Sequence, residues 1–247
     1  MLLLAITFNA CKKTTSTATG TFLMHLHTDI DTNEVDDTTM LYKDATGRHI
    51  SIAVAQFYIS NVVLTNVNGS TYTIKDARIL KNIDSEQYVL GTAPVGTYSS
   101  VTFDVGLDAA TNALQPTAFT TTGFIDNSSM WFGSTSQGFM FLKLQGKADT
   151  TTAQNGTNLV PFSYEIGSAA NLKTVTMPVR GSGSYATYQP YILTAGGYNY
   201  IHLIADYGKL LSVIDFKTQD STDTYTTNPT LSNTIANNIP NMFRYEE

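Results

Sequence analysis

Two histidines, His25 and His27, are the residues best suited to bind a metal ion. They alternate with Phe22, Met24 and Leu26, and this alternation of polar and apolar side chains predicts a β-strand. Because residues i and i+2 of a strand point to the same face, both imidazoles should lie on one face, where they could share an ion. The alternative is that they only form the polar outer face of an amphipathic strand.

Softer ligands occur near the single tryptophan, Trp131, which follows Met130. The next segment, 138–146, is apolar on both faces, which predicts a central strand buried on both sides. Met130 and Met140 carry thioethers that suit Cu(I), and Trp131 should lie at the rim of this strand. As alternatives, a methionine beside a core strand often fills a gap, and a tryptophan is a common core or rim residue.

Three further residues deserve comparison with the histidine pair. Glu165 shares a strand face with Ser163 and would be a metal ligand if the pair faces it. His49 and His202 stand alone in the sequence, so we expect them to be structural or surface histidines.

An acidic segment, 29–37, follows the histidine strand. Asp29, Asp31 and Asn33 match the first three ligand positions of an EF-hand loop, which suggests a Ca²⁺ site. However, Glu34 stands where that loop requires glycine, and Met40 where it requires the closing glutamate. This excludes an EF-hand and leaves a looser Ca²⁺ site or a solvated acidic loop.

Common catalytic motifs are missing from the sequence. It has no Gly-x-Ser-x-Gly, no His-Glu-x-x-His, no glycine-rich phosphate loop and no Cys-x-x-Cys-His. We therefore expect a binding protein rather than an enzyme.

Length and composition fit one large β domain or two small ones. The 247 residues are 42% hydrophobic and only 14% charged, and Thr, Ser, Asn, Gly and Tyr suit strands and turns more than helices. The net charge of -6 argues against a nucleic-acid partner, because phosphate binding needs clustered lysine and arginine.

The N-terminus resembles the end of a bacterial lipoprotein signal. A short apolar run, 1–10, stops at a small residue directly before Cys11, the only cysteine. We expect Cys11 to be lipidated, 12–20 to be a polar tether, and 21–247 to form the domain. This predicts a protein lipid-anchored in the bacterial cell envelope, on the periplasmic or outer-membrane surface. The alternative is a soluble protein with a frayed apolar start.

Most of the chain predicts short strands separated by turns. The main signals are alternation over 101–107, a long β-rich segment over 49–64 with a bulge near 55–56, a hairpin turn at 68–69, and helical spacing after 228. We predict an all-β, single-domain antiparallel β-sandwich with long loops and a short C-terminal helix.

Five segments share their residues and order with one known family. They are 56–64 (QFYISNVVL), 94–98 (PVGTY), 103–108 (FDVGLD), Met130-Trp131 followed by 138–144 (GFMFLKL), and 162–167 (FSYEIG). Over roughly 22–177 the chain resembles the MbnP-like copper-binding family of periplasmic and lipid-anchored bacterial proteins.

The resemblance implies a β-sandwich that holds a copper ion, with the Met-Trp motif near the site. In some members the tryptophan is thought to be oxidised by a partner di-haem enzyme, so a di-haem oxidase or a TonB-dependent transporter is an expected partner. Glu165 stands where such proteins commonly place a histidine, and a carboxylate suits copper less well than imidazole. The expected copper site comprises His25, His27, Met130, Trp131 and Glu165.

A second hypothesis needs no metal. An interaction or structural lipoprotein of the same fold could bind protein or glycan partners through tyrosine-rich loops, because exposed aromatic residues favour interfaces. These tyrosines are Tyr185, Tyr188, Tyr191, Tyr198 and Tyr200. The copper hypothesis requires at least three of its five residues to converge. The interaction hypothesis requires them scattered and the tyrosines clustered outside.

Overall fold

The computed structural model describes residues 17–119, 128–179 and 189–246. The lipidation candidate Cys11 lies outside these ranges, as do Tyr185 and Tyr188, so the lipid anchor stays a prediction. Among the described helices, none has both the length and the apolar character needed to span a bilayer.

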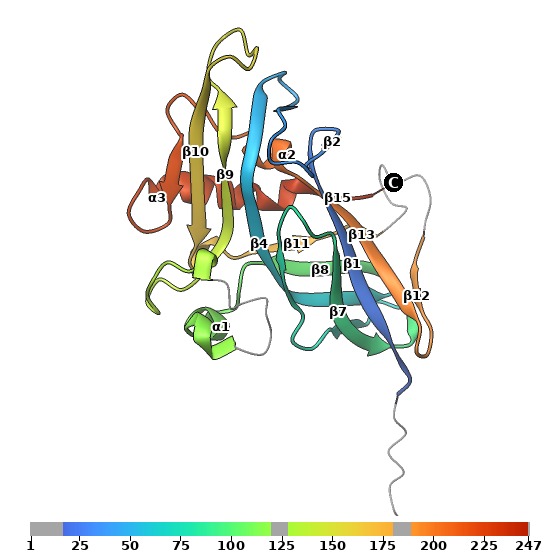
Figure 1. Cartoon of the computed structure of the whole chain (residues 1–247). Helices are drawn as coiled ribbons and strands as arrows, with labels where there is room; N and C mark the ends of the chain where they lie inside the picture. Colours follow the sequence, from blue (N-terminus) through green and yellow to red (C-terminus); the bar gives the residue numbers. More distant parts are fainter. Residues whose placement is uncertain (1–16, 120–127, 180–188, 247) are drawn as a thin grey trace, which may run out of the picture.

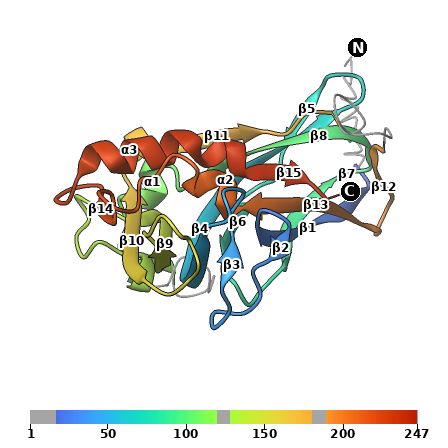
Figure 2. The same ribbon diagram turned by 90° about the horizontal axis from the view of Figure 1, so that it is seen from above.

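Strands dominate the described ranges (Figures 1 and 2). The strands are β1 Thr19–Ile30, β2 Asn33–Glu34, β3 Tyr42–Lys43, β4 His49–Asn66, β5 Thr71–Thr73, β6 Arg78–Lys81, β7 Gln87–Pro94, β8 Gly96–Val105, β9 Met140–Asp149, β10 Leu159–Gly167, β11 Lys173–Thr176, β12 Tyr191–Leu193, β13 Tyr198–Asp206, β14 Ser221–Asp223 and β15 Phe243–Tyr245. The α-helices are α1 Ala109–Asn112, α2 Tyr207–Leu211 and α3 Pro229–Asn238.

The smaller sheet has five strands and is built around β1. On one side β1 pairs in parallel with β13, which in turn pairs with β15. On its other side β1 pairs with β7 along its first part and with β2 at its end, both antiparallel. Figure 1 shows β1 running beside β7 and β13. Segments from both ends of the chain therefore meet in one sheet.

The larger sheet has ten strands, and its long strand is β4. β4 pairs with β9 over its first half and with β8 over its second half. β9 lies between β4 and β10, and its first residues are buried on both faces. The prediction of a central strand at 138–146 is therefore confirmed.

The core lies between the two sheets. Phe22 of β1 packs edge-to-face on Tyr98 of β8 with ring centroids 5.5 Å apart, and Phe243 of β15 packs in the same way on Phe103 of β8 at 5.0 Å. Removing such aromatic surface from water contributes most of the stability of a packed sandwich. The predicted all-β sandwich is confirmed, and so is the C-terminal helix, now α3.

Two details differ from the antiparallel sandwich predicted from the sequence. β1 pairs with β13, and β10 with β14, in parallel. Strands far apart in the chain are not held by a short hairpin, so the connection does not dictate an antiparallel direction. The irregularity expected near 55–56 falls slightly earlier, because the register of β4 against β9 shifts between Ile52 and Val54.

Candidate metal centre

Three histidines meet on the outer face of the five-stranded sheet. His25 and His27 project from β1 on the face opposite Met24 and Leu26, which are fully buried in the core. The parallel register sets His202 of β13 directly opposite His25, with their Nδ1 atoms 3.2 Å apart. Paired residues in neighbouring strands share a face, so the sheet itself assembles the three imidazoles.

Three glutamates surround these histidines, each at a strand end. Glu34 is in β2, next to the end of β1. Glu86 directly precedes β7, and its carbonyl accepts a hydrogen bond from the backbone N–H of Leu26 at 2.8 Å. Glu246 follows β15, and its backbone N–H donates to the carbonyl of His202 at 3.3 Å. Backbone hydrogen bonds thus fix Glu86 and Glu246 beside the histidine strands.

His27 contacts all three carboxylates. Its Nδ1 lies 2.8 Å from Glu34 Oε1 and 3.2 Å from Glu86 Oε1. Its Nε2 lies 3.4 Å from Glu246 Oε1. The imidazole is therefore enclosed by negative charge on both of its nitrogen sides.

His25 contacts two carboxylates through different nitrogens. Its Nε2 lies 3.4 Å from Glu86 Oε2, and its Nδ1 lies 3.5 Å from Glu246 Oε2. The same oxygen of Glu246 lies 3.0 Å from His202 Nδ1. The ring of His25 is 4.3 Å from that of His27 and 5.1 Å from that of His202. His25 is therefore the middle residue of the cluster.

The local electrostatics reflect this crowding. Burial opposes the charged form of His27, but the hydrogen bond to Glu34 and the charges of Glu86 and Glu246 outweigh it and raise the pKa of this imidazole. The hydrogen bond from His27 lowers the pKa of Glu34. Burial raises the pKa of Glu246, but hydrogen bonding to His202 and the nearby imidazoles reverse this and leave it lowered. The site thus favours a cation among its carboxylates.

A buried lysine supports the loop that carries Glu86. The side chain of Lys81 is fully buried, and its Nζ donates to the carbonyl oxygens of Asn82 and Ser85, both at 2.7 Å. The hydroxyl of Tyr88 also donates to the Ser85 carbonyl at 2.7 Å. Burial lowers the pKa of Lys81 to about 8, although neighbouring carboxylates oppose this. These bonds shape the turn between β6 and β7 and hence the position of Glu86.

The cluster contains two groups of three side chains with the spacing of metal ligands. One is His25, His27 and Glu86, and the other is His25, His202 and Glu246. In each group the ligand atoms all lie within 4.8 Å of one another. Imidazole nitrogen and carboxylate oxygen are ligands of Zn²⁺ and Cu²⁺, so the arrangement is compatible with a bound transition metal.

The other three predicted copper ligands lie elsewhere. Met130 is fully buried in a second apolar cluster, and the ring of Trp131 packs there against Phe139 at 4.7 Å between centroids. Glu165 is on β10 in the larger sheet, where its carboxylate lies 3.8 Å from Lys143 Nζ. Of the five residues, the structure brings together His25 and His27 only, so the predicted ligand set, which required at least three to converge, is wrong. Four residues not predicted as ligands complete the cluster.

His202 and the three glutamates were missed for a physical reason. The alternation of polar and apolar residues in 198–206 could have placed His202 on a polar strand face. The pairing of that strand with β1, however, depends on tertiary structure. Instead of lying alone at the surface, His202 joins the cluster. His49 instead contacts the backbone carbonyl of Gln154, as expected of a structural histidine.

The calcium prediction finds no support in the described residues. Asp29 accepts a hydrogen bond from Arg244 Nη2 at 2.6 Å, so a guanidinium already faces this carboxylate. Among the described residues, two groups of side chains lie close enough together to share a metal ion, and neither group includes Asp29 or Asp31.

The tyrosines that the structure describes do not form one external cluster. Tyr191 is buried in the core, whereas Tyr198 is 71% exposed and Tyr200 is 37% exposed. Tyr198 and Tyr200 share a face of β13 with His202, and the rings of Tyr200 and His202 are 5.8 Å apart. Tyr200 therefore adjoins the candidate metal centre, and Tyr198 lies two residues further along the same strand face.

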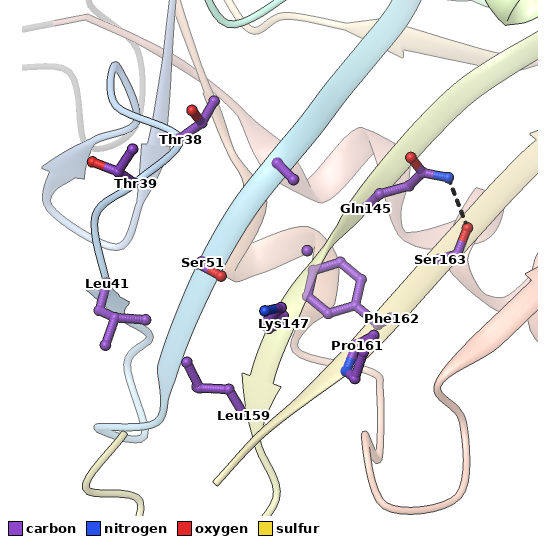
Figure 3. A pocket seen from close by; sticks show the side chains of 12 residues that line it. Thr38, Thr39, Leu41, Ser51, Gln145, Lys147, Leu159, Pro161, Phe162 and Ser163 are labelled. Carbon is purple, nitrogen blue, oxygen red and sulfur yellow. Dashed lines mark hydrogen bonds between the residues drawn. The ribbon is translucent and has the colours of Figure 1, made fainter. Parts of the chain in front are cut away.

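A hollow of about 700 Å³ lies over β4, β9 and β10 of the larger sheet (Figure 3). Gln145 and Ser163 hydrogen-bond across its lining at 3.0 Å, and Lys147 is the one charged residue among the described residues that line it. Its lining offers no group of metal ligands, so we place the candidate functional site at the histidine cluster.

The fold and the cluster define an all-β sandwich with a histidine–glutamate centre on its outer face. Residues 19–230 match the family model described as MbnP, and the chain belongs to this family. A solved structure, MbnP from Methylosinus trichosporium, is similar with a TM-score of 0.53 and 13% sequence identity, over 85% of this chain and 82% of that chain. At this identity the likeness shows a shared fold. No curated protein matches the chain. Family membership indicates an extracellular or periplasmic protein.

Proposed function

We propose that this protein binds copper at the outer-face cluster of three histidines and three glutamates. The observation that carries the proposal is the convergence of His25, His27 and His202, which come from two paired strands and lie within ligand distance of Glu86 and Glu246. A merely polar strand face would not require imidazoles from two distant segments to meet. The role is binding or transfer of the metal rather than catalysis.

The donor set favours a divalent ion. Imidazole and carboxylate are harder ligands than thioether, and among divalent first-row metals Cu²⁺ binds such sites most tightly. Met130, the candidate soft ligand for Cu(I), lies in the separate apolar cluster. Cu²⁺ is therefore the form of copper that this centre suits best, with Zn²⁺ as its nearest competitor.

The cellular setting follows from the sequence and the family. An acyl chain on Cys11 would hold the sandwich at a membrane surface in the cell envelope, with residues 12–20 as the tether. The metal would then be received from or passed to another envelope protein, for which a di-haem oxidase and a TonB-dependent transporter remain the expected partners. Trp131 is partly exposed where it packs against the second apolar cluster, which supports access by an oxidising partner.

The test is the metal content of the protein purified from its native host, together with Cu²⁺ uptake after metal removal. The H25A/H27A double variant should lose the copper, because it removes two of the three imidazoles. H49A is the matched control, since His49 contacts Gln154 outside the cluster, and it should bind as the unaltered protein does. Absence of copper in the native protein and no uptake of added Cu²⁺ would refute the proposal.

A second candidate function is recognition of a protein or glycan partner without metal. The supporting observation is the exposed pair Tyr198 and Tyr200 on β13. If this surface binds the partner independently of the metal, replacing both tyrosines with serine should abolish partner capture and leave the copper content unchanged. Loss of capture only in H25A/H27A would instead favour a partner that recognises the metal-loaded centre.

A further inference from the structure

The two groups of metal ligands share one residue, His25. His27 and Glu86 complete one group, and His202 and Glu246 complete the other. A single ion bound by all five side chains would need them to converge on one point. The contacts of His25 itself instead fall on two sides of its ring, with Glu86 at Nε2 and Glu246 at Nδ1, although Glu246 also reaches Nε2 of His27 at 3.4 Å.

The two nitrogens of His25 face different partners. Nε2 lies 3.4 Å from Glu86 Oε2, whereas Nδ1 lies 3.2 Å from His202 Nδ1 and 3.5 Å from Glu246 Oε2. The nitrogen lone pairs of one imidazole diverge, so a single ion cannot bind both. Two ions, each bonded to one nitrogen at about 2 Å, would lie roughly 6 Å apart across the ring.

The strand arrangement explains why His25 has partners on both sides. β1 lies between β13 and β7, and His25 is paired with His202 on the first and with Gln87 on the second. Glu86, next to Gln87, therefore approaches from one side, and His202 with Glu246 from the other. The central strand thus presents one imidazole to two separate sets of ligands.

Charge balance favours two divalent ions over one. Glu34, whose Oε1 lies 2.8 Å from His27 Nδ1, adds a further carboxylate beside the first group. The three glutamates carry three negative charges, and a doubly coordinated imidazole has lost its N–H proton and carries a fourth. Two divalent cations offset these four charges. A single ion bound through one nitrogen leaves His25 neutral, so its two charges oppose the three of the glutamates and one negative charge stays partly buried, which is unfavourable.

We infer that His25 bridges two divalent metal ions, one held with His27 and Glu86 and the other with His202 and Glu246. The N–H proton of His25 is released to solvent when the second ion binds, as metal binding generally displaces protons from its ligands. This inference rests on the proposed function of the cluster as a copper site and adds its nuclearity and its bridging ligand.

The test is titration of the metal-free full chain with Cu²⁺, followed by metal analysis and low-temperature EPR spectroscopy. An imidazolate bridge couples the unpaired electrons of two Cu²⁺ ions. The EPR signal should therefore grow up to one equivalent and fall as the second ion binds. Bound copper should reach two ions per chain.

Two single variants should each remove one of the two ions, H202A the ion beside β13 and H27A the ion beside Glu86. H202A and H27A should each bind a single Cu²⁺ and show the full, uncoupled EPR signal at saturation. H25A should show no coupled signal at any loading, and H49A should retain two coupled ions. Circular dichroism of each metal-free variant checks the fold. H202A and H27A control for each other, because each should lose one ion and keep the other.

The outcomes separate this inference from the proposed function. One copper ion per chain in the unaltered protein would overturn the bridge while leaving the copper site in place. Two ions with full EPR intensity would also overturn the bridge. No bound copper would overturn both.

Discussion

His25 and His202 occupy opposite positions in the parallel pair β1–β13, with their Nδ1 atoms 3.2 Å apart. A chain separation of 177 residues lies between them. The histidine–glutamate cluster is therefore a product of tertiary structure, and its properties should respond to changes far from the histidines in sequence.

Trp131 should be dispensable for metal binding. The structure places it against Phe139 in a separate apolar cluster, and the W131F variant preserves that aromatic packing. We expect W131F to bind the same amount of copper as the unaltered protein, measured by metal analysis after dialysis. An oxidative mass increase localised to Trp131 in protein from the native host would link this residue to a partner oxidase. Loss of copper from W131F would show that the indole takes part in the site.

The metal-free protein should lose stability as pH rises through the folded pKa of His27. Because that pKa is raised, the protonated imidazole contributes stability that is fully present below its unfolded value of 6.5 and is lost above the folded value. The lowered pKa values of Glu34 and Glu246 act in the opposite direction, and their contribution is lost as pH falls below about 4.5. Urea unfolding from pH 4 to 9 should therefore show a maximum between these limits.

Bound Cu²⁺ should reverse the alkaline part of this profile. The ion replaces the proton of His27 as the cation among the carboxylates, so copper affinity should rise with pH over the same range. The H27A variant is the control, because its metal-free stability should lack the loss on the alkaline side. An identical profile for H27A and the unaltered protein would contradict the assignment to His27.

Lys81 should make stability rise between about pH 8 and pH 10.5. Its folded pKa of about 8 is below the ordinary lysine value of 10.5, so the unfolded chain binds more protons in this range. The difference corresponds to about 3 kcal/mol. Urea unfolding should show this rise in the unaltered protein relative to K81M, in which the titrating group is absent. Parallel pH profiles for the two proteins would refute it.

Gly146 should be intolerant of a side chain because of the close approach of β4 and β9. A Cβ at this position would lie 2.0 Å from the backbone carbonyl oxygen of Ser51, which cannot move without disturbing the sheet. G146A should lose about 3 kcal/mol or more of unfolding free energy in urea. G96A is a matched control, because its nearest neighbour, the Asn66 side-chain nitrogen at 3.2 Å, can shift. Equal stabilities of the two variants would contradict the prediction.

Local patterns were sufficient for much of the fold. The alternation around His25 predicts both the strand and the shared face of the two histidines, because the period of two is a property of the strand alone. The run at 138–146 predicts a strand buried on both faces, and spacing after 228 predicts α3. Each of these features depends on neighbouring residues only.

The candidate metal centre depends instead on which strands pair. Glu86 reaches His25 because β7 pairs with β1 and because Lys81 holds the preceding turn, and neither fact has a local signature. Met130 and Trp131 were expected near the histidines because the resemblance associates a Met-Trp motif with copper. In this chain they pack into the second apolar cluster.

The parallel pairing of β1 with β13, together with the antiparallel pairing of β13 with β15, brings candidate ligands together from both ends of the domain, from His25 to Glu246. A chain cut before β15 retains the first ligand group but lacks Glu246, and so cannot form the second. Under the proposed copper binding, full occupancy would report that β1, β7, β13 and β15 have all paired, because the two ligand groups together draw on these four strands.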